Sequence, residues 1–312
     1  MEKVKRIASL DEKIEILKKK LRGGVTPAMA TPVLDDGVTV NTAVVPNLVN
    51  FLLDAGVSGL FVGGSTGEGI LFSEAERMRL HEAAVSATNG RVPLLLHVGT
   101  NRLADTLVLA RHAAEIGADA IVIVMPYFYG MHDDGLAAYC YAVAASAPDL
   151  PLLLYDIPQL AINGVSPVLL RRLGQEIPSL AGIKSSRPDA QIVRQLIDAT
   201  AKHLVFLVGN EAVALGLLGL GADGLISGLC TAVPEPFVAL TQAFSQGDMA
   251  EALRQQRLIN QLLVQLPNGA RIGAIKQILT ARGVLMGTAV PPRPMPTEDV
   301  WLKMQPLLNQ DS

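Results

Sequence analysis

The sequence predicts an α/β fold, a (β/α)8 TIM barrel in which each of eight parallel strands is followed by a helix. Three observations support this prediction. Short apolar runs rich in β-branched residues alternate eight times with longer helical patterns after residue 23. The apolar runs are almost continuous, which is typical of parallel strands buried on both faces. A Gly-x-x-Gly or Gly-x-x-Ala unit starts at Gly56, Gly117 and Gly221, where a helix ends and a strand begins.

The alternation assigns each element a place along the chain. The strands are expected at residues 25–31, 59–63, 93–98, 120–125, 152–155, 182–184, 205–209 and 224–227. The helices that follow them are expected at residues 42–55, 73–88, 101–116, 133–146, 166–175, 188–201, 211–219 and 234–246.

Residues 1–22 differ in net charge from the barrel that is predicted at residues 23–247. We expect them to form a helical arm. They hold eight basic and four acidic residues, a net charge of +4, so the remaining chain carries −3 − 4 = −7. Ser9 and Glu12 make a capping box at the start of an amphipathic helix. The apolar positions of this helix are spaced by four, three and four residues, at Leu10, Ile14, Leu17 and Leu21. We expect this helix to lie on the barrel or on a neighbouring subunit. A short coiled-coil or membrane-surface arm is the alternative.

Residues 248–312 extend past the barrel as a C-terminal helical extension. Three further helical patterns occur at residues 248–266, 270–283 and 297–308. A proline-rich stretch at residues 291–296 predicts a stiff connection before the last of them.

Composition excludes several function classes. Half of the 312 residues are hydrophobic, which excludes a disordered chain, and two cysteines are too few for a disulfide scaffold. A net charge of −3 gives no sign of a nucleic-acid partner. No apolar stretch reaches the roughly 18 residues of a spanning helix, and no cleavable leader follows the basic N-terminus. We therefore expect a soluble, cytoplasmic protein without a membrane partner.

Lys184 is the most informative single residue. Active groups of such barrels gather at the carboxyl ends of the strands, and Lys184 ends the apolar run Ala181-Gly182-Ile183. A lysine in this position loses hydration, which favours the neutral amine that attacks carbonyl carbon. The alternative is a structural lysine paired with a carboxylate, either Asp156 or Glu211.

Three other strand ends carry polar groups. Gly63-Gly64-Ser65-Thr66-Gly67-Glu68-Gly69 offers backbone N–H groups and two hydroxyls to an anion, although it is neither a Walker loop nor a dinucleotide fingerprint. Tyr155 can carry a proton, or it can be a packed barrel residue. Gly209 and Glu211 follow the seventh strand. His97 with Glu68 and Glu211 would be a sparse metal site, so we expect no metal.

These motifs, in this order, resemble those of the dihydrodipicolinate synthase / N-acetylneuraminate lyase family. The resemblance rests on Gly64-Ser65-Thr66-Gly67-Glu68, Tyr155-Asp156-Ile157-Pro158 and Gly182-Ile183-Lys184, with Gly24-Val25-Thr26-Pro27 at the start. It extends from about residue 23 to about residue 306, so it includes the helical extension.

The resemblance implies a class I carbon–carbon lyase that needs no cofactor. Lys184 would form a Schiff base with pyruvate or another 2-oxo acid, and the iminium would be the electron sink. Ser65 and Thr66, with their backbone amides, would hold the carboxylate beside Gly64. Tyr155 would move the proton, with the Ser65 hydroxyl in the relay. Gly209 and Glu211 would border the aldehyde half of the substrate. Family members are commonly homotetramers, built as dimers of dimers.

Departures from the family pattern bear on the substrate. Leu160 stands where the synthase branch has an arginine that grips aspartate semialdehyde, which disfavours lysine biosynthesis. Asn210-Glu211-Ala212 lacks one carboxylate of the pair that sialic acid lyases carry, and Gly228 replaces their serine. Phe128 occupies the place of the tyrosine that many members lend to the neighbouring subunit. Either Tyr129 substitutes for that tyrosine or the relay between subunits is absent.

Four hypotheses follow. The first is an aldolase that cleaves or forms a 2-oxo-3-deoxy sugar acid or a related 2-oxo-4-hydroxy acid, from pyruvate and an aldehyde. The second, in the same family, is 4-hydroxy-tetrahydrodipicolinate (dihydrodipicolinate) synthase. The third is a non-catalytic barrel that binds a 2-oxo acid, although a binding protein needs no reactive amine. The fourth is a metal-dependent class II aldolase.

Overall fold

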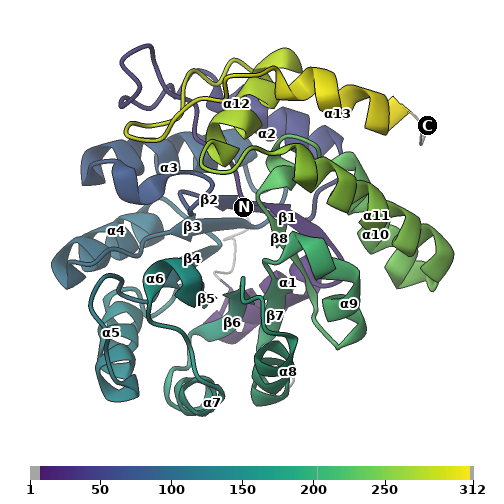
Figure 1. Ribbon diagram of the computed structural model, residues 1–312. Coiled ribbons are helices and arrows are strands. Elements are labelled where there is room, and N and C mark those ends of the chain that lie inside the picture. The colour runs from purple at the N-terminus through teal and green to yellow at the C-terminus, as the bar shows by residue number, and fades with distance from the viewer. Residues whose placement is uncertain (1–7, 202, 310–312) are drawn as a thin grey trace, which may run out of the picture.

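The computed structural model describes residues 8–201 and 203–309, and its centre is a barrel of eight parallel strands (Figure 1). The strands are β1 (Val25–Pro27), β2 (Leu60–Val62), β3 (Leu94–His97), β4 (Ala120–Val124), β5 (Leu152–Asp156), β6 (Leu180–Ser185), β7 (Val205–Val208) and β8 (Gly224–Ser227). They pair in the order β1-β8-β7-β6-β5-β4-β3-β2. A bridge between Ala28 and Phe61 joins the two ends, so the sheet closes and the predicted fold class is confirmed.

Helices surround the strands as an outer ring (Figure 1). Those of the barrel are α2 (Val45–Asp54), α3 (Glu74–Thr88), α4 (Leu103–Glu115), α5 (Asp133–Ser146), α6 (Pro158–Ala161), α7 (Pro167–Glu176), α8 (Ala190–Ala199), α9 (Ala214–Gly219) and α10 (Glu235–Gln246). Short 3-10 turns follow three strands: η1 (Gly69–Leu71), η2 (Glu211–Val213) and η3 (Leu229–Thr231). Outside this ring lie α1 (Leu10–Leu21), α11 (Met249–Gln265), α12 (Arg271–Ala281) and α13 (Val300–Asn309).

Three elements differ from the sequence-based prediction. The first strand ends at Pro27, because the chain then bends and Thr31 donates its hydroxyl to the carbonyl oxygen of Gly67. The segment predicted as one helix over 211–219 begins as the 3-10 turn η2 and becomes α-helical only from Ala214. A four-residue helix, α6, follows β5 and was not predicted, since its residues show no helical period.

The inside of the barrel is a core of its own. Alternate strand residues point inward, so Leu153 and Tyr155 of β5 face the barrel interior while Leu152 and Leu154 pack against the outer helices. The same alternation places Lys184 on the inner side of β6, since its neighbour Ile183 belongs to the outer core. Burial of two faces explains why the strands are almost continuously apolar.

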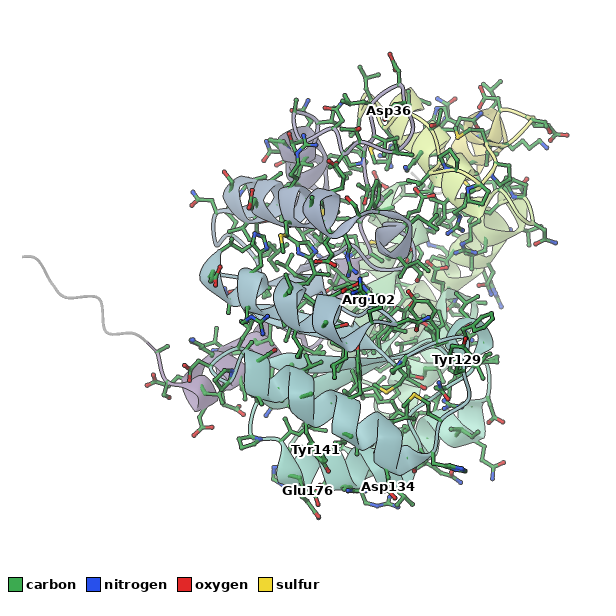
Figure 2. The ribbon with its side chains drawn as sticks, turned by 90° about the vertical axis from the view of Figure 1, so that its left-hand side faces the viewer. Asp36, Arg102, Tyr129, Asp134, Tyr141 and Glu176 are labelled. Atoms are coloured by element: carbon green, nitrogen blue, oxygen red, sulfur yellow. The ribbon has the colours of Figure 1, made fainter. Side chains whose placement is uncertain are left out.

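Helix α1 packs against the amino-terminal end of this interior. Its capping box is formed, because Ser9 accepts from the backbone of Glu12 and Glu12 accepts from the backbone of Ser9. The apolar stripe Ile14, Leu17 and Leu21 belongs to the same buried cluster as the inward side chains of the strands. Helix α1 therefore lies on the barrel, as the first of the two interpretations expects, whereas residues 1–7 of the predicted arm lie outside the described residues. It stands at the left in Figure 2, opposite the labelled Tyr129.

The repeated glycine units have two separate functions. Their first glycines, Gly56, Gly117 and Gly221, all have a positive φ, which confirms the predicted role at helix ends. The last glycines of two units make room for α1. A side chain at Gly59 would come within 3.1 Å of Leu21, and one at Gly224 within 2.5 Å of the Leu21 carbonyl oxygen. The sequence predicts these units at helix ends, and the contacts of Gly59 and Gly224 with α1 give a second reason for glycine.

The C-terminal extension lies along one side of the barrel, where α12 and α13 run above β1 and β2 in the view of Figure 1. Helix α11 packs on α10, and α12 contacts both α13 and η3. This position brings the start of α12 to the carboxyl ends of the strands. Within the described part of the chain, no helix is both long and apolar enough to cross a membrane.

Candidate active site

A cavity of about 540 Å³ opens at the carboxyl ends of the strands. Of the residues that the sequence nominates, the wall contains Ser65, Thr66, Tyr155, Lys184, Gly209 and Glu211. Gly64 does not line it. A side chain at Gly64 would lie 2.5 Å from the Phe61 ring, so this glycine permits close packing behind the loop. The cavity wall also includes Arg271, Gln159, Ser186, Asn210 and Gly228, which the sequence motifs did not nominate as substrate contacts.

Lys184 lies at the buried end of this cavity, with a side chain that is almost completely inaccessible to solvent. Its Nζ is 4.1 Å from the centroid of the Tyr155 ring and 4.7 Å from that of Phe61. Tyr155 and Lys184 are direct partners in the pairing of β5 with β6, which fixes their side chains on the same inner face. Gly209 leaves space for the amine, because a side chain there would lie 3.1 Å from Lys184 Cε.

Neither carboxylate proposed as a structural partner of Lys184 pairs with it. Asp156 is completely buried and accepts from Arg187 Nε at 2.7 Å and from the Ser185 hydroxyl at 2.8 Å. Glu211 forms its ion pair with Arg271. Among the residues that the structure describes, no acidic group forms an ion pair with Lys184. The geometry therefore removes the structural alternative and leaves the amine facing the cavity.

Tyr155 and Ser65 are joined by a hydrogen bond of 2.8 Å between their hydroxyl oxygens. The Tyr155 ring also meets the rings of Phe61 and His97 edge to face, at centroid distances of 5.9 and 6.2 Å. These contacts hold the phenol between Lys184 and the Ser65 loop. A proton can thus pass from one hydroxyl to the other without large movement.

The loop from Gly63 to Gly69 is compact because its glycines contact backbone atoms. A side chain at Gly69 would lie 1.8 Å from the Gly63 carbonyl oxygen, and one at Gly67 would lie 2.8 Å from that of Met29. The loop presents the hydroxyls of Ser65 and Thr66 to the cavity. Ser73 then caps α3 by accepting a hydrogen bond from the backbone of Glu76.

Glu68 anchors the same loop to the C-terminal extension. It adopts a left-handed backbone conformation with φ of 55° and pairs with Lys276 of α12 at 2.8 Å. Both side chains are completely buried. Glu68 also accepts from the backbone of Val290, and Lys276 donates to the carbonyl oxygen of Thr288. Burial lowers the pKa of Lys276, and the nearby Glu68 opposes this shift.

The carboxylate of Glu211 has hydrogen-bond and ion-pair partners that the sequence does not reveal. Its Oε1 accepts from the Ser227 hydroxyl and from the Leu229 backbone, both at 2.7 Å, and its Oε2 pairs with Arg271. Gly228 lies between these partners, and a side chain there would come within 2.7 Å of the Thr66 hydroxyl. The pattern of strands and helices places Glu211 at the barrel mouth but gives no sign of Arg271, which comes from 60 residues further along.

His97 lies behind Tyr155 and carries no metal-ligand cluster. Its pKa is well below the ordinary value because burial and the guanidinium of Arg77 both disfavour the charged ring. Arg77 Nη2 donates to the His97 carbonyl oxygen at 2.6 Å, and burial lowers the pKa of Arg77 to about 10. In the described ranges there is no group of three or more His, Cys, Asp or Glu side chains placed to hold a metal ion.

Phe128 and Tyr129 project from the rim on the loop after β4. Phe128 has a φ of 79°, and both side chains are more than two-thirds exposed. Asn163 fixes this loop by donating to the carbonyl oxygens of Pro126 and Tyr129 and by accepting from the backbone of Met131. Tyr129 does not line the cavity of its own chain, and it lies at the right in Figure 2.

Comparison with known proteins gives one consistent family. The model of the dihydrodipicolinate synthetase family matches residues 21–310. A 4-hydroxy-tetrahydrodipicolinate synthase of Salinibacter ruber is 33% identical over 229 residues, which cover 73% of this chain and 75% of that protein.

Two solved structures resemble the whole barrel and its extension. The wild-type sialic acid aldolase of Ruminococcus gnavus has a TM-score of 0.89 and 27% identity, covering 93% of this chain and 98% of its own. A prophage protein of the dihydrodipicolinic acid synthase family from E. coli K12, in complex with pyruvate, has a TM-score of 0.85 and 28% identity. That match covers 92% of this chain and 97% of the other.

Proposed function

The chain belongs to the dihydrodipicolinate synthetase family and is a carbon–carbon lyase of that type, and we propose that it joins or cleaves pyruvate and an aldehyde through a Schiff base on Lys184. The observation that carries this proposal is the position of Lys184. Its amine is buried at the end of a cavity, has no acidic partner among the described residues, and lies 4.1 Å from the centre of the Tyr155 ring. An amine in such surroundings is suited to attack a carbonyl carbon.

In the direction of cleavage, the Lys184 amine adds to the keto carbon of the substrate, and the keto oxygen leaves as water. The resulting iminium draws electrons from the bond between C3 and C4. As that bond breaks, Tyr155 removes the proton of the C4 hydroxyl, and the aldehyde departs. The enamine that remains takes up at C3 the proton that Tyr155 removed, and water hydrolyses the resulting iminium to pyruvate and free Lys184. The reverse sequence forms the bond. No cofactor is needed, because the iminium accepts the electron pair.

The Ser65 and Thr66 loop supports binding of the substrate carboxylate. Both hydroxyls line the cavity, and the loop is held in place by close glycine contacts and by the Glu68–Lys276 pair. Ser65 is also bonded to Tyr155, so the same hydroxyl can receive the proton that Tyr155 removes. Carboxylate binding and proton transfer are thus coupled through one side chain.

The outer cavity supports a polar aldehyde half. Gln159, Ser186 and Asn210 line it, which suits a 2-oxo-3-deoxy sugar acid or a related 2-oxo-4-hydroxy acid. The second candidate is 4-hydroxy-tetrahydrodipicolinate synthase, which the Salinibacter ruber relative favours. Against it, Leu160 is two-thirds exposed at the position of the synthase arginine and carries no charge, so a semialdehyde carboxylate would need another cation of the cavity.

We also propose a homotetramer built as a dimer of dimers, working in the cytoplasm. Apolar side chains are exposed around the rim at Ile70, Phe128, Tyr129, Leu160 and Ile162. A smaller apolar cavity of about 90 Å³ lies beneath them, between Ile70, Tyr127 and Leu160. A second copy on this surface would cover it. The free, buried thiols of Cys140 and Cys230 suit a reducing compartment.

Borohydride reduction in the presence of pyruvate tests the proposal. We expect intact protein to gain one pyruvate-derived adduct, and peptide mapping to place it on Lys184. Lys184→Arg should gain none, whereas Lys303→Arg, which changes an exposed lysine of α13, should react as the wild type. Wild-type protein without an adduct would contradict the proposal. If Lys184→Ala bound pyruvate as tightly as the wild type, and neither turned over any 2-oxo acid, a non-catalytic binding protein would be the better description.

A further inference from the structure

We propose that Arg271 binds an anionic group, a carboxylate or a phosphate, at the far end of the aldehyde half of the substrate. This inference rests on the proposed function and narrows its substrate class to 2-oxo acids that carry a second anion. Arg271 is the first residue of α12 and reaches the cavity that also contains Lys184. The C-terminal extension, which the sequence treats as an addition to the barrel, thus supplies part of the binding site.

Arg271 has hydrogen-bonding capacity to spare. One nitrogen, Nη2, donates to Glu211 Oε2, which fixes the direction of the guanidinium. Nε and Nη1 have no hydrogen-bond partner among the residues that the structure describes, and 41% of the side chain is exposed. Nη2 carries a second N–H, which lies on one edge of the guanidinium together with either Nε or Nη1. That open edge can take a carboxylate or phosphate with two parallel hydrogen bonds.

Glu211 is poorly placed to be the main contact itself. Its side chain is only 9% exposed, and three donors already occupy its oxygens: the Ser227 hydroxyl, the Leu229 backbone and Arg271. The carboxylate is therefore a fixed support for the arginine. At this end of the cavity the unused groups are mainly the N–H donors of Arg271, which an anion satisfies better than a hydroxyl does.

The other described residues that line the cavity would not repel a second anionic group of the substrate. The other polar groups beyond Lys184 are the neutral side chains of Gln159, Ser186 and Asn210. The guanidinium of Arg187 is held by the completely buried Asp156, and Arg187 does not line the cavity. Among the described residues that line the cavity, Glu211 is the only acidic one, and its charge is balanced by Arg271.

Matched 2-oxo acids test the inference without requiring turnover. The half-saturating concentration for borohydride trapping would be measured for 2-oxoglutarate, 2-oxoadipate and 2-oxopimelate, each beside the unbranched monoacid of equal chain length. Aldol formation from pyruvate would be compared for glyceraldehyde and glyceraldehyde 3-phosphate, which separates a phosphate from a carboxylate. The variants are Arg271→Gln, Arg271→Lys and Glu211→Gln. Arg257→Gln, an exposed residue of α11 outside the cavity, controls for the loss of one positive charge.

In at least one matched pair, we expect the wild type to bind the anionic compound more tightly than the compound without that anion. The half-saturating concentration or the KM should then be about tenfold lower for the anionic compound. Arg271→Gln should abolish this preference while pyruvate still forms its adduct, and Arg271→Lys should retain part of it. Glu211→Gln should keep the preference, because the guanidinium remains.

Two results would overturn the inference. One is a wild type that shows no preference in any pair. The other is an equal loss in Arg271→Gln and Glu211→Gln, which would make Arg271 a mere support for Glu211. Failure of the proposed function is a different result, namely the absence of any adduct with pyruvate itself.

Discussion

The hydroxyl oxygens of Ser65 and Tyr155 lie 2.8 Å apart, although 90 residues separate them in the chain. Ser65 follows β2 and Tyr155 lies on β5, so the closed barrel is what brings them together. Lys184 completes the group from the neighbouring β6, with its amine above the face of the Tyr155 ring. Three strands thus bring together one buried amine and a pair of hydroxyls that can pass a proton.

Because the Tyr155 hydroxyl is bonded to that of Ser65, we expect Tyr155→Phe to impair proton transfer without preventing Schiff-base formation. Removal of the hydroxyl should lower kcat by about 10²- to 10⁴-fold, the usual contribution of a positioned acid or base. Lys184 should still be trapped with pyruvate, because its amine and the Ser65 and Thr66 loop remain. Ser65→Ala should lower kcat less and raise KM for pyruvate as well. An unchanged kcat in Tyr155→Phe would exclude this tyrosine as the proton carrier.

The buried Glu68–Lys276 pair predicts a large effect on stability. Lys276→Met removes the closer of the two cations that pair with the buried Glu68 carboxylate, and Arg293 Nε remains 3.8 Å from it. Loss of one partner from a buried ion pair typically costs about 3–5 kcal/mol of unfolding free energy, and the remaining Arg293 places the expected loss at the lower end of that range. The double variant Glu68→Gln with Lys276→Met should recover part of this loss, because no uncompensated charge remains. Urea unfolding of the two single variants and the double variant measures the coupling. Additive losses would show that the two side chains act independently.

The buried His81 should make the free energy of unfolding depend on pH. It is completely buried, neither ring nitrogen has a partner within the described residues, and burial holds its pKa well below the ordinary 6.5. The unfolded chain therefore takes up a proton below pH 6.5 that the folded chain does not. Stability should fall as the pH drops below 6.5, by about 1.4 kcal/mol per pH unit from this residue.

His81→Leu isolates this contribution. Other titrating groups affect the wild type and the variant alike, so the difference between their unfolding free energies should change between pH 7.5 and pH 5.5 in favour of the variant. Urea unfolding at the two pH values measures it. His132→Gln, which changes an exposed histidine just before α5, is the matched control. Parallel pH profiles for wild type and His81→Leu would mean that His81 protonates in the folded state.

The barrel and the position of Lys184 could be predicted because both depend on local patterns. Alternating apolar runs and helices fix the strand order, and parallel strands bring all their carboxyl ends to one rim. Lys184, Tyr155 and Ser65 each follow or end such a run, so the sequence already places them together. The glycines at helix ends were predictable for the same reason, since a positive φ is a local requirement.

Other features depend on contacts between distant segments. Lys276 looks like any lysine of a helix until α12 packs beside the loop of Glu68, and Arg271 enters the cavity only through that same packing. Likewise Asp156 and Glu211 were equally good partners for Lys184 until Arg187 and Arg271 were placed beside them. The sequence by itself determined the fold, the rim and the position of Lys184 at that rim. The tertiary structure alone decided which charges pair, because Coulomb attraction and burial depend on distances that no local pattern records.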